Sequence, residues 1–184
     1  MAILLPTLAV KRVTDITPEM LRDIDVRGMI LDVDNTLSRH GCPVPFQGSV
    51  AWTYEMRAAG IRVIILSNNF KRRVSEFAAQ YHLPYLYRAF KPLPKGYHQA
   101  MQYLRLPAEE IVVVGDQIFT DVLGANAVGM KSILLTPQDM EHSLTFRIRR
   151  KIEAPIRRRI HKTGCYRTTD SDRDALHGRN TDRR

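Results

Sequence analysis

Long apolar segments are missing from this sequence of 184 residues. No run of about 18 apolar residues occurs, so no segment is expected to cross a bilayer as a helix. The apolar start, Met1 to Val10, lacks a basic region and is interrupted by Pro6, which argues against a secretory signal. We therefore expect a cytoplasmic protein, with contact at the inner face of the membrane as its closest approach to lipid.

Cysteine is equally scarce, because Cys42 and Cys165 are the only two. Neither belongs to a Cys-x-x-Cys pair or to a Cys/His cluster with metal-site spacing, so both are predicted to be free thiols in a reducing compartment. His40 and Cys42 flank Gly41, but structural zinc normally needs four protein ligands. We interpret this stretch as an ordinary loop.

The net charge of +9 is concentrated at one end of the chain. Residues 1–146 contain 15 Lys or Arg against 14 Asp or Glu, whereas residues 147–184 contain 13 against 5. A near-neutral domain with a basic appendage suggests an anionic partner for the appendage, either membrane lipid or nucleic acid. The hydrophobic content of 44% is enough for one compact domain of roughly 150 residues plus a tail.

Between Arg27 and Pro137, short apolar runs alternate with longer amphipathic segments, which is typical of repeated βα units. The pattern predicts strands at 28–33, 61–67, 111–115 and 131–135, a short fifth near 85–87, and helices at 48–59, 71–81, 95–104 and 120–127. Thr17 and Pro18 form a further helix-start signal. We expect an α/β fold with a mostly parallel central sheet.

We divide the chain into an N-terminal extension at 1–26, a domain at 27–140, a basic amphipathic helical segment at 141–163 and a polar tail at 164–184, predicted to be disordered. In the helical segment, apolar residues recur every fourth position, with Lys and Arg between them: Leu144, Ile148, Ile152, Ile156 and Ile160. Such a segment suits an anionic membrane surface, and we expect that contact through residues 143–162.

Two alternatives for this segment stay open. The apolar stripe could instead pack against the domain, with its charges in solvent. The arginines could also bind nucleic acid, which we favour less because Phe146 and Tyr166 are the only aromatic residues in the region. Pro155 lies inside the segment and predicts two short helices rather than one.

Asp32 and Asp34 stand directly after the apolar run Met29 to Leu31, where a buried strand should end. In an open parallel sheet, ligands bind outside the carboxyl ends of the strands. Closely spaced carboxylates repel one another unless a hard cation such as Mg²⁺ lies between them. A simple turn is the alternative, since Asp and Asn favour turns.

Three further groups of polar residues follow the predicted strands in order. Ser67, Asn68 and Asn69 could donate hydrogen bonds to phosphate oxygens or pack in a turn. Lys91 precedes a proline and can reach a site as a point charge, whereas Lys95 begins a predicted helix and is the weaker candidate. Asp116 and Asp121 then follow the strand at 111–115.

This series resembles the four-motif signature of the haloacid dehalogenase (HAD) superfamily of phosphatases, over about residues 25–136. The resemblance implies a Rossmann-like three-layer fold and a role for each motif. Asp32 would be the nucleophile that forms an aspartyl-phosphate, and Asp34 the general acid and then the base. Ser67, Asn68 and Lys91 would bind the phosphoryl oxygens.

The resemblance also implies a Mg²⁺ site. Asp32, the backbone carbonyl of Asp34 and Asp116 would supply ligands, with Asp121 supporting them from behind. Capping of the helix near Thr120 is an alternative role for Asp121.

The loop lengths leave no room for a cap domain. About ten residues separate Leu37 from the next predicted helix and about twenty separate Asn69 from Lys91, so the site should be open and suited to a bulky substrate. Within the superfamily (subfamily IIIA), the motifs most resemble the YqeG-type branch, similar to phosphatidylglycerophosphate phosphatases. The expected substrate is therefore phosphatidylglycerophosphate or another bulky phosphorylated head group. A soluble sugar phosphate, a nucleotide, or a non-catalytic membrane- or RNA-binding role are the alternatives, and the oligomeric state is left open.

Overall fold

The computed structural model describes residues 2–137 and 144–162. Six strands form one sheet in the order β1-β6-β5-β2-β3-β4, and every pair is parallel. The strands are β1 (Leu8–Val10), β2 (Gly28–Leu31), β3 (Arg62–Leu66), β4 (Tyr85–Leu86), β5 (Ile111–Gly115) and β6 (Lys131–Leu135). The predicted α/β fold with a parallel sheet is therefore confirmed.

The central strands are apolar runs because both of their faces are buried. All residues of β2 and β5 are buried, and β2 lies between β3 and β5. The five strands expected from the sequence are present, β4 as only two residues. The pattern of apolar runs does not predict β1, in which Leu8 pairs with Ile133, so part of the predicted extension at 1–26 lies in the sheet.

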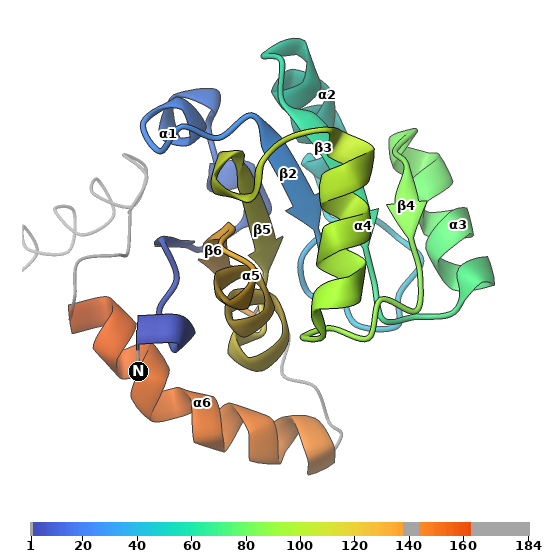
Figure 1. The fold of residues 1–184 in the computed structure, drawn as a ribbon. Coiled ribbons are helices and arrows are strands. Elements are labelled where there is room, and N and C mark those ends of the chain that lie inside the picture. The colour runs from blue at the N-terminus through green and yellow to red at the C-terminus, as the bar shows by residue number, and fades with distance from the viewer. Residues whose placement is uncertain (1, 138–143, 163–184) are drawn as a thin grey trace, which may run out of the picture.

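Helices pack on both faces of the sheet, as Figure 1 shows. The longer ones are α2 (Ser49–Ala58), α3 (Lys71–Tyr81), α4 (Pro94–Leu104) and α6 (Leu144–Lys162). The shorter ones are α1 (Pro18–Arg22), α5 (Leu123–Ala127), the 3-10 turns η1 (Ala2–Leu4), η2 (Val13–Asp15) and η3 (Ala108–Glu110), and the π-helix η4 (Ile118–Val122). The predicted helix at 120–127 is thus a π-helical turn followed by a short α-helix.

Two hydrophobic clusters fill the space between the sheet and the helices on its two faces. Trp52 of α2 and Phe77 of α3 pack with Leu31 on one face, and Tyr97 and Leu104 of α4 pack with Ile30 on the other. Neighbouring residues of β2 point to opposite faces, so one strand contributes to both clusters. This arrangement is the three-layer fold expected from the sequence, and the described residues include no cap domain between its strands and helices.

The C-terminal helix α6 corrects one prediction, because it runs through Pro155 as a single helix. Pro155 lies on the exposed side, where water can hydrate the carbonyl group that loses its helical hydrogen bond. Glu153, before this position, bonds to the Ile118 backbone N–H, and Ile156 and Ile160, after it, pack on the domain, so the helix is held on both sides of Pro155. Among the described residues, none of the helices is long and apolar enough to cross a membrane. The predicted disorder of 164–184 falls outside the described ranges.

Candidate active site

The site lies at the carboxyl edge of the sheet, where three adjacent strands end. Asp32 follows β2, Ser67 follows β3 and Asp116 follows β5. The chain proceeds from β2 to β3 on one side, while β5 lies on the other, so β2 stands where the strand order reverses. Such a switch point is where open α/β sheets bind ligands.

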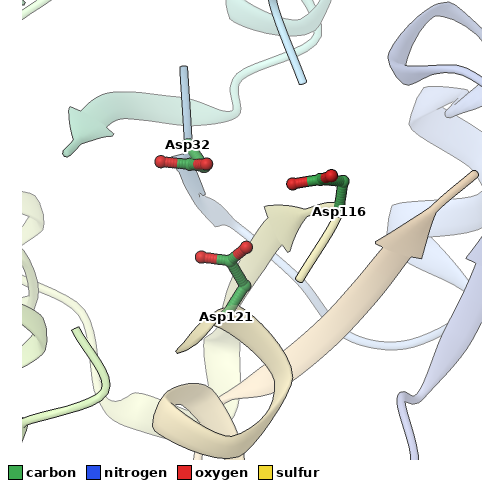
Figure 2. Close-up of side chains that lie close together, drawn as sticks. All are labelled: Asp32, Asp116 and Asp121. Atoms are coloured by element: carbon green, nitrogen blue, oxygen red, sulfur yellow. The ribbon is translucent and has the colours of Figure 1, made fainter. Parts of the chain in front are cut away.

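Three carboxylates meet at this edge, and Figure 2 shows them turned toward a common space. Ligand atoms of Asp32, Asp116 and Asp121 all lie within 4.8 Å of one another, and the three residues are buried. Asp32 and Asp116 come from strand ends, and Asp121 comes from η4. All three are candidate site residues from the sequence, and the structure brings them together.

Lys91 joins two of these carboxylates. Its Nζ donates to Asp32 Oδ1 at 2.6 Å and to Asp121 Oδ1 at 2.7 Å, and its side chain is almost completely buried. Burial alone would lower the pKa of Lys91, but the neighbouring Asp121 and Asp32 carboxylates outweigh it and raise this pKa above its ordinary value. Lys91 therefore stays charged.

The charge balance of this cluster fits a divalent cation. Three carboxylates face a single ammonium group, which leaves two negative charges in excess when all are ionised. Burial raises the pKa of Asp32 to about 8; Lys91 opposes this shift and the nearby Asp121 carboxylate adds to it. A hard cation with oxygen ligands would favour the charged carboxylates and relieve their repulsion. Asp32, Asp116 and Asp121 are thus the side chains that could hold Mg²⁺.

The side chain of Asp34 is used differently. Its carboxylate accepts hydrogen bonds from Asn69 Nδ2 at 2.6 Å, Arg73 at 2.5 Å and the Gly41 backbone N–H at 3.0 Å. Asp34 therefore lies outside the carboxylate cluster, which agrees with its expected metal contact being through the backbone only. Arg73 is a site residue that the sequence motifs do not predict; the signal for it is the basic run at the start of α3, one residue after the polar residues 67–69.

Ser67 and Asn68 line the same edge. Ser67 Oγ accepts from the Asn69 backbone N–H at 3.2 Å, so its hydroxyl hydrogen can still be donated. The Asn68 amide bridges the backbone of Lys91, accepting from its N–H at 2.7 Å and donating to its carbonyl at 3.2 Å. Asn68 thus holds the Lys91 segment in place, and the second N–H of its amide can still point to a ligand. Lys95 is exposed on α4.

Gly115 explains how Asp121 approaches Asp116 so closely. A Cβ atom added at Gly115 would lie 2.7 Å from Cβ of Asp121 and closer still to its carboxylate. Asp121 Oδ2 also accepts from the Gln117 backbone N–H at 3.2 Å, so it stabilises the turn as well as facing Lys91. The alternative capping role and the supporting role in the site are therefore compatible.

These residues surround a hollow of about 250 Å³ at the surface. Its lining is polar and comes from four segments that are far apart in the sequence: Asp32, Asp34 and His40; Ser67, Asn68 and Asn69; Lys91; Gln117 and Thr120. Carboxylates, an ammonium group, a hydroxyl and amides converge there. This donor set can bind a phosphoryl group together with a cation.

The sequence is similar to those of known proteins over most of the residues that form this sheet. The model of the haloacid dehalogenase-like hydrolases matches residues 19–129. The chain is 38% identical over 160 residues to the probable phosphatase YqeG of Bacillus subtilis, which covers 87% of this chain and 93% of that protein. It is also 40% identical over 43 residues to a glyceraldehyde 3-phosphate phosphatase of Pyrococcus abyssi, covering 23% of this chain and 18% of the relative.

Two solved structures share the fold at 17% sequence identity. One is a protein from Listeria monocytogenes serotype 4b, with a TM-score of 0.53 over 65% of this chain and 86% of that chain. The other is a D,D-heptose 1.7-bisphosphate phosphatase from B. bronchiseptica in complex with magnesium and phosphate, with a TM-score of 0.52 over 59% of this chain and 80% of that chain.

Proposed function

The chain belongs to the haloacid dehalogenase-like hydrolases and is a phosphatase, and we propose that it is a Mg²⁺-dependent phosphomonoesterase that forms an aspartyl-phosphate on Asp32. The observation that carries this proposal is the buried cluster of Asp32, Asp116 and Asp121 around Lys91, beside a polar hollow at the sheet edge. When bound to these carboxylates, Mg²⁺ would offset the negative charge of the phosphoryl group.

The side chains then divide the reaction between them. A carboxylate oxygen of Asp32, oriented by Lys91, forms a bond to phosphorus while the bond from phosphorus to the leaving oxygen breaks. Asp34 gives a proton to that oxygen. Asp34 next takes a proton from water as the water attacks phosphorus, which releases inorganic phosphate and restores Asp32. Ser67 and Lys91 stabilise the charge on the phosphoryl oxygens throughout.

A bulky lipid head group is the substrate class that we favour, with phosphatidylglycerophosphate as its first candidate. The hollow is not covered by a cap among the described residues, so a large molecule can reach it. A second hollow, of about 280 Å³, is lined in part by Arg73, the residue that donates a hydrogen bond to Asp34. Its lining combines apolar and basic side chains, including Phe70, Phe77 and Arg72. It offers space for a leaving group that carries both an apolar part and a negative charge.

The outer face of α6 supports the same choice. Lys151, Ile152, Pro155, Arg158 and Arg159 are exposed there, with Ile152 at 55% of its full exposure. A basic surface with an exposed apolar residue suits the cytoplasmic face of an anionic membrane. We therefore place the enzyme in the cytoplasm, bound peripherally to the membrane that contains its substrate.

A soluble sugar phosphate is the second candidate, because a short segment resembles a glyceraldehyde 3-phosphate phosphatase. Phosphate release would be measured with Mg²⁺ on phosphatidylglycerophosphate in mixed micelles and on soluble phosphomonoesters at equal concentration. We expect the lipid to be preferred, and preference for a soluble compound would overturn the lipid assignment. Asp32→Asn should abolish turnover, whereas Asp25→Asn, at an exposed position whose positive φ suits Asn, should not.

Membrane contact is tested by sedimentation with anionic vesicles. Lys151→Gln combined with Arg158→Gln should weaken binding, because both exposed charges lie on α6. The matched control, Arg57→Gln with Arg105→Gln, removes the same charge from exposed positions in α2 and directly after α4 and should leave binding unchanged. Equal loss in both double variants would indicate attraction by net charge alone. Sedimentation of RNA in place of vesicles would show whether α6 binds nucleic acid instead.

A further inference from the structure

The inner face of α6 carries two charged residues that reach the backbone around Asp116. Glu153 is fully buried, and its Oε1 accepts from the Ile118 backbone N–H at 3.0 Å. The Arg157 guanidinium donates to the backbone carbonyl of Asp116 and, at 3.3 Å, to that of Leu135. Glu153 and Arg157 also pair with each other at 3.3 Å, one helical turn apart.

These contacts fix the segment that carries two of the three clustered carboxylates. Asp116 directly follows β5, and Ile118 begins η4, which contains Asp121. Arg157 holds the peptide group before Gln117, and Glu153 holds the peptide group after it. Because α6 holds both peptide groups, it fixes the direction of the Asp116 side chain. It also fixes the start of the turn that leads to Asp121.

The residues on this face of α6 are those that pack against the domain. Glu153, Ile156, Arg157 and Ile160 follow the spacing of one helical face, and Ile160 packs in a cluster with Ile118. Glu153 is the single acidic residue between positions 142 and 169 of the sequence. A carboxylate is costly to bury unless it is hydrogen-bonded and paired. Its burial among the basic residues of this segment is repaid by the Ile118 N–H and by Arg157.

We propose that Glu153 and Arg157 are positioning residues that hold Asp116 and the start of η4 in the arrangement that binds Mg²⁺. The proposal rests on the metal site of the proposed function and adds a role for α6 inside the enzyme. Neither side chain is expected to touch the substrate or the metal. Each acts through the backbone of the segment at 116–118.

The test uses the full chain and measures Mg²⁺ binding by calorimetry, without substrate, together with the melting temperature without metal. Glu153→Ala and Arg157→Gln should each weaken Mg²⁺ binding at least tenfold. Glu153→Gln keeps an oxygen that can accept from the Ile118 N–H, so it should stay within threefold of the wild type. Rescue by the amide distinguishes a held backbone from a general need for charge at position 153.

Two control variants separate positioning from helix packing. Ile160→Val removes a methyl group from the same interface and should lower the melting temperature while leaving the Mg²⁺ affinity unchanged. Arg158→Gln lies on the exposed face and should change neither quantity. If Glu153→Ala and Arg157→Gln lower only the melting temperature, the positioning role is wrong.

The outcomes also separate this inference from the proposed function. If the wild type binds Mg²⁺ and the variants weaken that binding, the inference stands even when no phosphomonoester is hydrolysed. If the wild type hydrolyses phosphomonoesters and the variants bind Mg²⁺ normally, the inference falls and the function stands. Absence of Mg²⁺ binding by the wild type would overturn the inference directly.

Discussion

Replacing Lys91 with Met should affect folding and Mg²⁺ binding in opposite directions. The substitution keeps most of the side-chain length but removes the ammonium group that contacts Asp32 at 2.6 Å and Asp121 at 2.7 Å. Both carboxylates are nearly inaccessible to solvent. In the metal-free protein, their mutual repulsion is then no longer offset by the charge between them.

The expected loss of stability without metal is about 3 to 5 kcal/mol, the usual cost of removing one partner from a buried ion pair. Domains are typically stable by about 5 to 15 kcal/mol, so most of the protein should remain folded. Loss of Lys91 also raises the pKa of Asp32 further, because Lys91 opposes the rise to about 8 that burial causes, so the comparison is made at a pH where Asp32 is ionised in both proteins. There the Mg²⁺ affinity should rise, because the Lys91 ammonium no longer repels the cation. Two unit charges about 4 Å apart interact by about 1 kcal/mol in water, and a divalent ion doubles this figure, so we expect at least tenfold tighter binding.

Urea unfolding with and without Mg²⁺ measures both effects in one experiment. Tenfold tighter binding returns about 1.4 kcal/mol more stability to the variant than to the wild type at high Mg²⁺. The difference in unfolding free energy between the two proteins should therefore shrink when Mg²⁺ is added. Lys95→Met, at an exposed position, is the control and should show no such change. A difference that stays constant or grows would refute the placement of Lys91 between the carboxylates.

Three smaller substitutions test other parts of the structure. Gly115→Ala places a methyl group against Asp121 and should weaken Mg²⁺ binding and cost about 1 to 3 kcal/mol of stability, measured by calorimetry and urea unfolding. Trp52→Phe removes the 2.7 Å hydrogen bond to the buried Ile16 carbonyl and should lower the unfolding free energy by about 2 to 4 kcal/mol. Its unfolding must be measured by circular dichroism, because Trp52 is the only tryptophan and its fluorescence is lost in the variant. Thr17→Ala removes the cap of α1 and should cost about 1 kcal/mol in the same assay, and an unchanged midpoint would contradict the cap.

Much of the fold could be predicted because its signals are local. The apolar runs that became β2, β3, β5 and β6 are buried on both faces, and such runs can be recognised without knowing their partners. The α1 cap was also predictable, since Thr17 bonds to Met20 only three residues away. In contrast, β1 has three residues and gains its place from pairing with β6, more than 120 residues later.

The site shows the same division. Asp32, Asp116 and Ser67 follow strands that a sheet brings together, so their proximity follows from the parallel topology. Arg73 contacts Asp34 from the third residue of α3, and nothing in the spacing alone distinguishes it from Lys71 or Arg72. Such a contact depends on where a long flexible side chain finds a partner across the loop, and this is decided by packing.

The division of α6 into a face that packs on the domain and a face exposed to solvent limits how strongly the helix can bind a membrane. Ile156 and Ile160 pack on the domain, so their apolar surface is not available to lipid, and Ile152 is the exposed isoleucine on the described part of the helix surface. Each basic residue near an anionic membrane contributes about 1 kcal/mol, and Lys151, Arg158 and Arg159 together therefore give only about 3 kcal/mol. This attraction is weak and sensitive to salt. A phosphorylated lipid held in the open site would have to supply the remaining affinity, so binding to vesicles should strengthen when the substrate lipid is present.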